Sequence, residues 1–107
     1  MSTTTKHLLD ARAEVFKALG HPTRLAIVDM LAGGERCVCE IDEHIDADMS
    51  TVSRHLAVLR NVGILSSEKR GNQVFYRLEC PCITSFYACV ESVIRGGDGT
   101  VQLEASR

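Results

Sequence analysis

The sequence predicts a mainly α-helical domain that carries one small β-hairpin. Its 107 residues have the ordinary size of a single domain, and 45% of them are hydrophobic, which suffices for a small core. Apolar residues recur at helical spacing along most of the chain, whereas residues 64–78 alternate as strands do. Because a chain of this length buries limited surface by itself, a partner subunit would add to its stability.

Two helices are expected before the first cysteines. Residues 6–19 carry an apolar stripe that ends at Gly20, and Pro22 suits the first position of a second helix that stops at Gly33 and Gly34. The apolar positions that define the two stripes are Leu8, Val15, Phe16, Leu19, Leu25, Val28 and Leu31.

Two shorter helices are expected next. Ile41 and Ile45 indicate a third helix, and Asp48 is a suitable N-cap for a fourth helix that ends at Gly63. The positions of the fourth helix that face inward are Val52, Leu56 and Leu59.

A hairpin and a last helix complete the predicted domain. The stretch ILSSEKRGNQVFYRL, residues 64–78, is predicted to form two strands around Gly71 and Asn72. Residues 1–95 would then form one DNA-binding and sensor domain, and the glycine-rich residues 96–107 a flexible tail. The apolar positions of the second strand and the last helix are Val74, Tyr76, Leu78, Ile83, Phe86, Val90 and Val93.

The charge is unevenly distributed. Residues 50–77 hold five basic side chains and one acidic side chain, a local charge of +4 in a chain whose net charge is −2. Such a stripe suggests a polyanion that meets one face of the protein, although charge alone describes a solvated surface equally well. Two short helices joined by a polar turn and followed by a basic hairpin describe a winged helix-turn-helix. The fourth helix of that fold would enter the major groove of double-stranded DNA.

The start of the fourth helix and the tip of the hairpin hold the DNA-binding candidates. Hydroxyls and an arginine at a helix N-terminus suit base edges and phosphates. Taken singly, Thr51 and Ser53 could be ordinary helix surface, and His55 could be a buried, hydrogen-bonded histidine. The candidate residues are Met49, Ser50, Thr51, Ser53, Arg54, His55, Lys69, Arg70 and Asn72.

The sequence points to a cytoplasmic protein without a membrane partner. The first residues, MSTTTKHLLDARAEV, lack the continuous apolar core of a signal peptide. No apolar run approaches the ~20 residues needed to span a bilayer. Thiols stay reduced in the cytoplasm, and the odd number of cysteines, five, argues against a disulfide framework.

Four stretches resemble the ArsR/SmtB family of bacterial metal-responsive repressors, in its arsenic-sensing branch: EVFKALGHPTRLAIVDML, ERCVCEI, STVSRHLAVLRNVGIL and RGNQVFYRL. They appear in the family's order and cover roughly residues 12–79. The resemblance implies a homodimeric winged helix, dimerised through its first and last helices. It also implies that the dimer binds an operator near its own promoter and releases it when a metal or metalloid binds.

Cys37 and Cys39 resemble the inducer site of the arsenic and antimony sensors, and half of the cadmium/lead site of a related branch. Residues two apart in an extended segment point the same way, so their sulfurs can form a two-thiolate clip for a soft ion. Small apolar filler in a core is the alternative. The clip would lie where a strand passes into the third helix, beside that helix and off the groove-facing surface. The inducer would be arsenic(III) or antimony(III), with lead or cadmium as further candidates, and no constitutive cofactor is expected.

The sequence departs from the family pattern at the third ligand. Arsenic sensors usually add a cysteine three residues after the pair, where this chain has Asp42, and the last helix has no histidine for a zinc/nickel site. We expect the missing sulfur from Cys80 or Cys82. In a winged helix the strand before the third helix pairs with the second wing strand, here near its end at residues 78–80, which would bring these cysteines close to Cys37.

Two other functions also fit parts of the sequence. A thiol redox or persulfide sensor would use the same four clustered cysteines. An enzyme is suggested by Cys89 and Arg95, which match the C-x5-R spacing of oxyanion-loop phosphatases and arsenate reductases. That chemistry requires a glycine- or serine-rich loop of free N–H groups, but the intervening VESVI has apolar residues at helical spacing. We therefore expect a protein that is not an enzyme, with Cys89 in the core or the dimer interface.

Overall fold

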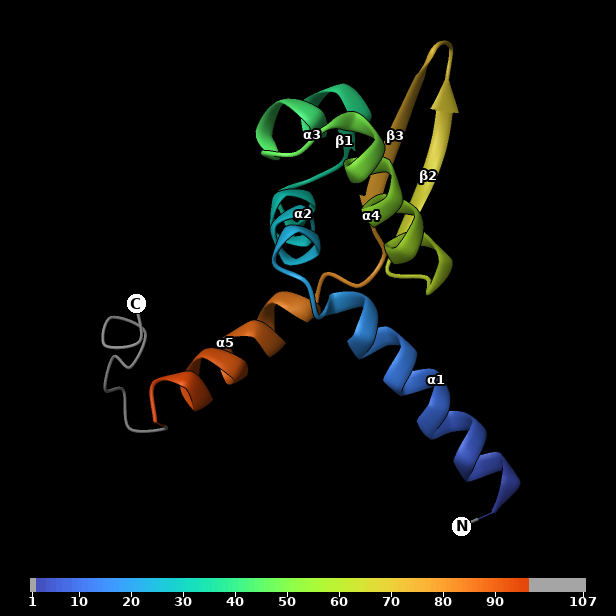
Figure 1. Ribbon diagram of the computed structural model, residues 1–107, viewed down its shortest axis with the longest axis vertical. Helices are drawn as coiled ribbons and strands as arrows, with labels where there is room; N and C mark the ends of the chain where they lie inside the picture. Colours follow the sequence, from blue (N-terminus) through green and yellow to red (C-terminus); the bar gives the residue numbers. More distant parts are fainter. Residues whose placement is uncertain (1, 97–107) are drawn as a thin grey trace.

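The computed structural model describes residues 2–96, and within this range the chain forms five helices and three strands (Figure 1). The predicted order of elements is confirmed. Of the tail predicted to be flexible, residues 97–107 lie outside the described range. The elements are α1 (Thr3–Leu19), α2 (Pro22–Ala32), β1 (Arg36–Cys37), α3 (Val38–His44), α4 (Met49–Asn61), β2 (Leu65–Arg70), β3 (Gln73–Leu78) and α5 (Ile83–Ile94).

Helix ends follow the local capping chemistry. Helix α1 begins at Thr3, earlier than the predicted residue 6, because the Ser2 side chain accepts a hydrogen bond from the Thr5 backbone N–H at 3.1 Å. Gly63 follows α4 with a φ of 87°, a left-handed conformation that glycine adopts without strain. The predicted end of the fourth helix is therefore confirmed.

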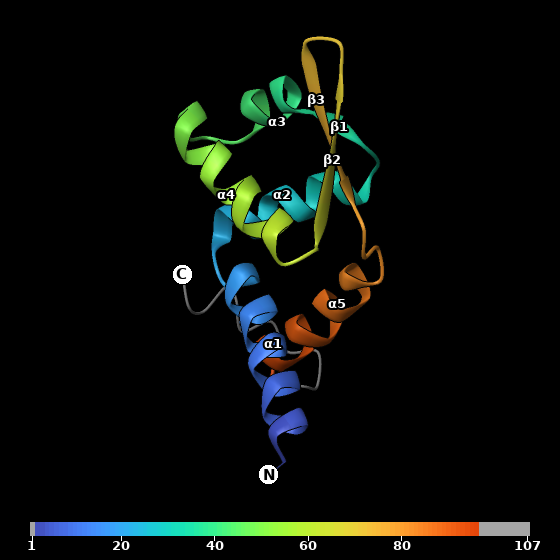
Figure 2. The ribbon, with the colours of Figure 1, turned by 90° about the vertical axis from the view of Figure 1, so that its right-hand side faces the viewer.

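Strand β3 is the centre of a three-stranded antiparallel sheet with the order β1-β3-β2 (Figure 2). Strands β2 and β3 form the hairpin, and Gly71 at its tip has a φ of 63°. On the other edge, β1 pairs Arg36 with Tyr76 and Cys37 with Phe75. The hairpin therefore projects from the body as a wing, while β1 ties its base to α3.

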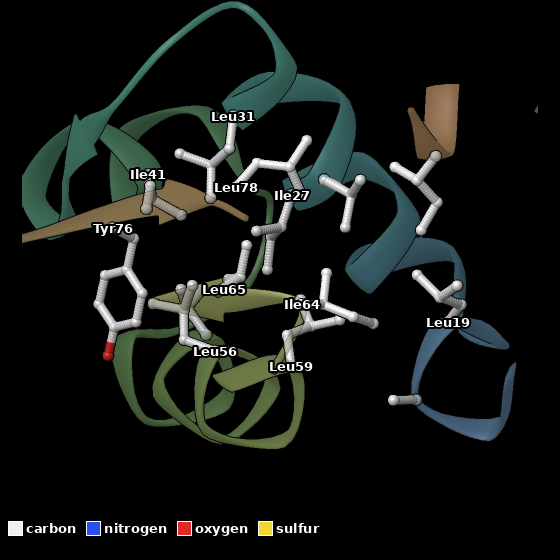
Figure 3. Close-up of a cluster of buried hydrophobic side chains, with 14 residues drawn as sticks. Leu19, Ile27, Leu31, Ile41, Leu56, Leu59, Ile64, Leu65, Tyr76 and Leu78 are labelled. Atoms are coloured by element: carbon white, nitrogen blue, oxygen red, sulfur yellow. The ribbon is translucent and has the colours of Figure 1, made fainter. Parts of the chain in front are cut away.

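One core lies between the sheet and helices α2, α3 and α4 (Figure 3). Tyr76 and Leu78 of β3 close it from the side of the sheet. Burying one large aliphatic side chain contributes about 1.5–3 kcal/mol, so this core holds α4 and the wing at a set angle. The largest fully buried side chains are Ile27, Val28, Ile41, Val52, Leu56 and Leu59.

Helices α1 and α5 extend from this body and diverge from each other (Figure 1). Only the last turn of α1 and the first residue of α5 are buried. Further out, the rings of Phe16 and Phe86 meet edge to face with their centroids 5.8 Å apart. The two helices thus leave an apolar face without cover in the single chain, formed by Leu8, Leu9, Phe16, Phe86, Val90, Val93 and Ile94.

A groove of about 380 Å³ opens between α1, α2 and α5. Phe16 of α1, Leu25 of α2, and Phe86 and Val90 of α5 are among the residues that line it. The Tyr87 hydroxyl is buried there without a hydrogen-bond partner among the described residues, and burial raises the pKa of Tyr87 to about 12. A contiguous apolar surface of this kind marks a macromolecular contact. Across residues 2–96, no helix combines the length and apolar character needed to cross a membrane.

Candidate nucleic-acid interface and thiol sites

Helix α4 presents a capped N-terminus at the surface. Asp48 Oδ1 accepts hydrogen bonds from the Thr51 backbone N–H at 2.8 Å and from the Ser50 hydroxyl at 2.9 Å. These bonds, with the Thr51 N–H as the main one, lower the pKa of Asp48. Among the residues predicted to contact DNA, Met49, Ser50, Ser53, Arg54, Lys69, Arg70 and Asn72 are exposed, whereas Thr51 and His55 are half-buried.

His55 turns toward α2 rather than outward. Its Nδ1 accepts a hydrogen bond from Arg24 Nε at 3.1 Å, and its ring centroid lies 4.4 Å from that of His21. Burial lowers the pKa of His55, and the neighbouring positive charges add to this effect. Of the two interpretations that the sequence left open, these contacts favour the hydrogen-bonded histidine, which positions α4. The sequence reasoning missed His21 and Arg24, although both lie in the GHPTR stretch of α2 and its cap.

Arg70 of the wing is held by two carboxylates. Its Nη atoms donate to Glu35 at 2.7 and 2.9 Å and to Glu68 at 2.6 Å, and its guanidinium lies 4.6 Å from the Phe75 ring centroid. The bonds to Glu35 and then to Glu68 raise the pKa of Arg70, and the same contact lowers the pKa of Glu35. We call Arg70, Glu35 and Glu68 the wing clasp. It joins the wing to the segment before β1. The sequence analysis had predicted Arg70 only as a DNA-binding residue.

Cys37 and Cys39 lie where β1 passes into α3, and a disulfide joins them across a Cα–Cα distance of 5.4 Å. Cys37 is 4% exposed and has extended backbone, whereas Cys39 is exposed in the first turn of α3. The Cys37 backbone N–H donates to Glu40 Oε1 at 3.1 Å, which stabilises this turn. The prediction that the two sulfurs meet is confirmed. The expected position, where a strand passes into the third helix, is also confirmed. The two sulfurs are bonded rather than free.

The Cys37–Cys39 pair lines a cleft of about 450 Å³ between α3, the start of α4 and the wing. Met49 of α4 and Asn72 of the wing line the same cleft. Asp42 lies there too, with its Oδ1 buried and without a partner in the described part of the chain. The sequence placed the pair off the groove-facing surface. The pair does lie beside α3, and its cleft is shared with both predicted DNA-facing elements.

Cys80 and Cys82 lie together, with their Sγ atoms 3.4 Å apart, but away from the first pair. The predicted strand pairing was wrong in register. Cys37 faces Phe75, so Cys80 lies five positions further along, about 16 Å at the rise of a strand. Within residues 2–96, no group of three or more Cys, His, Asp or Glu side chains is arranged to hold a metal ion. One chain therefore offers two separate pairs of sulfurs instead of a four-cysteine cluster.

Cys89 is a free, exposed cysteine within α5. The helix continues through it to Ile94, and Arg95 is the C-cap residue. Backbone N–H groups between Cys89 and Arg95 are thus engaged in a helix and do not form an anion-binding loop. The C-x5-R spacing is a coincidence of helical sequence.

Comparison with known proteins identifies the fold and its relatives. Residues 21–67 match the model of the bacterial regulatory protein, arsR family. The regulator MJ1325 of Methanocaldococcus jannaschii, itself uncharacterised, is 45% identical over 65 residues, which cover 60% of this chain and 73% of MJ1325. The arsenical resistance operon repressor of Escherichia coli is 46% identical over 66 residues, covering 61% of this chain and 56% of that repressor. The chain likewise spans about half of SmtB of Mycobacterium tuberculosis, at 54%.

A solved relative has the same architecture. The homodimeric winged helix-turn-helix DNA-binding domain Mb0332 of Mycobacterium bovis superposes with a TM-score of 0.75 at 33% identity. That match covers 87% of this chain and 86% of the Mb0332 domain. Mb0332 is a possible ArsR-family transcriptional regulator. From the helix-turn-helix, the wing and these similarities together, the chain belongs to the ArsR family of bacterial regulatory proteins.

Proposed function

We propose that this protein is a transcriptional repressor that binds operator DNA as a homodimer and releases it when arsenite or antimonite binds Cys37 and Cys39. The observation that carries the proposal is the position of this pair in a cleft shared with α4 and the wing. Thiolates bind soft ions. Similarity to the E. coli arsenical resistance operon repressor favours arsenic, and similarity to a CadC homolog of Staphylococcus aureus keeps cadmium as an alternative. We place this function in the cytoplasm and assign no enzymatic activity to it.

The uncovered faces of α1 and α5 support a homodimer. A second copy would cover the apolar side chains of both helices and fill the groove beside Phe86. Closed two-fold symmetry is the commonest arrangement of a homodimer. The two α4 helices would then enter successive major grooves about one helical turn (~34 Å) apart on a two-fold-related site.

The exposed residues at the start of α4 support direct contact with DNA. Ser53 and Arg54 are exposed one turn from the cap, and Arg54 carries the charge and the planar donors that suit guanine or phosphate. Lys69 and Asn72 at the wing tip would contact the adjacent backbone. His55 and Arg70 would act indirectly, because their polar atoms are already engaged within the protein.

The cleft supplies a physical route from inducer to DNA. An ion held by Cys37 and Cys39 would occupy space that Met49 and Asn72 also border, so the separation of α4 and wing would change. A coupling of ~1–3 kcal/mol is typical of such linkage. The same coupling must weaken inducer binding when DNA is bound, because linkage is reciprocal.

The third ligand of a bound arsenic cannot come from Cys80 or Cys82 of the same chain in this arrangement, given the register of β1 and β3. Arsenic(III) prefers sulfur, and the carboxylate of Asp42 is a poor substitute. A hydroxyl, a small thiol or a cysteine of the second subunit would complete the site. We therefore assign Cys37 and Cys39, in their reduced form, as the ligands that each chain supplies to its own inducer site.

The test is release of DNA from reduced, anaerobic protein during titration with arsenite. Operator sites can be selected from a random-sequence library. Cys37→Ser and Cys39→Ser should bind DNA normally but fail to release it, since a serine oxygen is a hard ligand. Cys89→Ser is the matched control and should release DNA as the original protein does. If both serine variants still respond, or if saturating DNA leaves arsenite affinity unchanged, this inducer mechanism must be abandoned.

The disulfide between Cys37 and Cys39 favours thiol redox sensing as the second candidate function. Two thiols would lose two protons and two electrons to an oxidant such as a peroxide or a low-molecular-weight disulfide. The same titration separates the two functions. Release of DNA on oxidation, combined with no response of the reduced protein to arsenite, would replace metalloid sensing by redox sensing.

A further inference from the structure

Arg24 of α2 forms hydrogen bonds to two other helices. Its Nη1 donates to the backbone carbonyls of Lys17 and Ala18, in the last turn of α1, at 3.4 and 3.0 Å. Its Nε donates to Nδ1 of His55 in α4 at 3.1 Å. One half-buried guanidinium therefore connects the helix that extends from the body with the helix that is proposed to enter the major groove.

The end of α1 needs a donor from outside the helix. In a continuing helix the Ala18 carbonyl would accept from the residue four positions later, but that residue is Pro22, which has no backbone N–H. The Arg24 guanidinium supplies the missing donor. It also places a positive charge at the C-terminal end of α1, where the helix dipole favours one.

The contact with α4 fixes one histidine ring. An arginine N–H can only donate, so Nδ1 of His55 is the acceptor and the neutral ring carries its proton on Nε2. The ring of His21 lies 4.4 Å from that of His55 between centroids, and its own Nδ1 accepts the Thr23 backbone N–H at 3.1 Å. His55 is thus held from the side of α2 by a hydrogen bond and by ring contact.

These groups border a cleft of about 570 Å³ between α2 and α4. His21, Arg24, Arg54 and His55 all line it, and among the described residues that line it there is no Asp or Glu. No carboxylate of this cleft therefore competes with α1 and α4 for the donors of Arg24. The cleft also places Arg24 close to Arg54, which is proposed to contact DNA.

The last turn of α1 sets the direction of that helix relative to α4. Ala18 and Leu19 are the buried residues of α1, and the rest of the helix extends away from the body (Figure 1). Further out, the contact between Phe16 and Phe86 joins α5 to α1. The direction of α1, and of the part of the apolar face that it carries, therefore depends on the turn to which Arg24 bonds.

We propose that Arg24 is a positioning residue for operator binding, which fixes α4 relative to the dimer axis and thereby selects the spacing of the two half-sites. The inference rests on the proposed homodimer and its two-fold-related operator. In such a complex the recognition helices lie about one helical turn apart, so one base pair more or less turns one half-site by about a tenth of a turn. To reach both half-sites of an altered operator, the dimer must rotate α4 against α1 and break the bonds of Arg24.

The strength of these bonds sets the size of the effect. Removing the Arg24 donors should reduce the preference for the correct spacing by about tenfold, the fold-change that corresponds to one charge-assisted hydrogen bond of about 1.5 kcal/mol. A side chain that contributed only to overall stability would instead lower the affinity for every spacing by the same factor. Spacing preference therefore separates positioning from general stabilisation.

The test measures the affinity of the dimer for a series of operators whose central spacer is one or two base pairs longer or shorter than in the selected site. Arg24→Met keeps an apolar stem but has no N–H donor, so it should lose most of the spacing preference while still binding the selected site. Arg54→Met is the matched contrast, because loss of a DNA contact should weaken binding at every spacing by a similar factor. An unchanged spacing preference in Arg24→Met would overturn the proposal, as would an original protein that shows no spacing preference.

Two variants of His55 keep the test decisive if urea unfolding shows that Arg24→Met does not fold. His55→Asn retains an acceptor near the position of Nδ1 and should keep the spacing preference, whereas His55→Leu removes the acceptor and should lose it. Full preference in His55→Leu would mean that Arg24 does not act through α4, and the proposal would then be wrong. Absence of DNA binding by the original protein would overturn the proposed function together with this inference. An original protein that binds DNA, with variants that all keep its spacing preference, would overturn this inference alone.

Discussion

The two C-x-C pairs show how the same spacing acquires different roles from its surroundings. Cys37 and Cys39 straddle a strand-to-helix turn, are joined, and line the cleft between α4 and the wing. Cys80 and Cys82 straddle a proline at the other end of β3, are free, and adjoin α5. In both cases the spacing brings two sulfurs together. The neighbouring elements decide whether a bound ligand would influence DNA contact or the apolar face of α5.

Truncating the buried isoleucine beside each cysteine pair should give the largest difference in stability between the two regions. Ile41 is fully buried and holds α3 beside the first pair, so Ile41→Ala should lower the free energy of unfolding by about 2–5 kcal/mol. Ile83, which follows the second pair, is 8% exposed and lies where α5 leaves the core, so Ile83→Ala should cost about 2 kcal/mol. Urea unfolding of reduced protein measures both. A larger loss for Ile83→Ala than for Ile41→Ala would contradict this expectation and mean that the start of α5 is the better anchored of the two.

Variants of the wing should distinguish a residue that contacts DNA directly from a residue that positions the wing. Lys69→Ala should reduce the slope of log K against log salt by about 0.9, as the loss of one phosphate contact does. Arg70→Ala should weaken DNA binding with little change in that slope, because Arg70 bonds Glu35 and Glu68 and thereby positions the wing. Binding titrations at several salt concentrations distinguish the two. An equal change of slope for Arg70→Ala would place its guanidinium on a phosphate.

Low pH should lower the free energy of unfolding through the protonation of His55 in α4. Burial lowers the pKa of His55 in the folded protein, while the unfolded chain has the ordinary value of about 6.5. As pH falls below about 6.5 the unfolded state takes up the proton first, so the free energy of unfolding should decrease until pH passes the folded pKa. Urea midpoints between pH 8 and 5 should fall less steeply in His55→Gln. The same change at exposed His44 is the control, and a similar flattening there would contradict this assignment.

The smallest effect is expected at the second pair. Cys82→Ala removes the hydrogen bond that raises the pKa of Cys80. At neutral pH a larger fraction of Cys80 would then be thiolate, and its alkylation by iodoacetamide should become faster. The gain should be modest because Cys80 remains half-buried. Peptide mapping gives the rate for each cysteine; Cys89→Ala should leave the Cys80 rate unchanged, and a slower rate in Cys82→Ala would count against the hydrogen bond.

Local signals in the sequence were sufficient for the fold. Pro22, Asp48, Gly63 and Gly71 each act through the backbone of their own neighbourhood, so they placed helix ends and the wing turn correctly. Periodicity likewise identified most of the core. The start of α1 was missed because its cap, Ser2, lies before the apolar stripe.

The site was less predictable because it depends on residues distant in sequence. His55 meets Arg24 across 31 positions, and Arg70 meets Glu35 across 35. The register of β1 against β3 depends on where the turn after α2 places β1. A strand of two residues is too short for its residue pattern to specify that register. This register keeps the two cysteine pairs apart, whereas the sequence analysis expected all four cysteines to lie together.

Because α1 and α5 diverge, the stability of the folded protein would depend on its own concentration. If the face between these helices is covered only by a second chain, folding and association draw on the same buried surface. The melting temperature should then rise with protein concentration, since mass action stabilises whatever the folded state binds. In a cell, dilution at division would lower the fraction folded as well as the occupancy of the operator. A low concentration of the protein alone would then begin to relieve repression, even without an inducer.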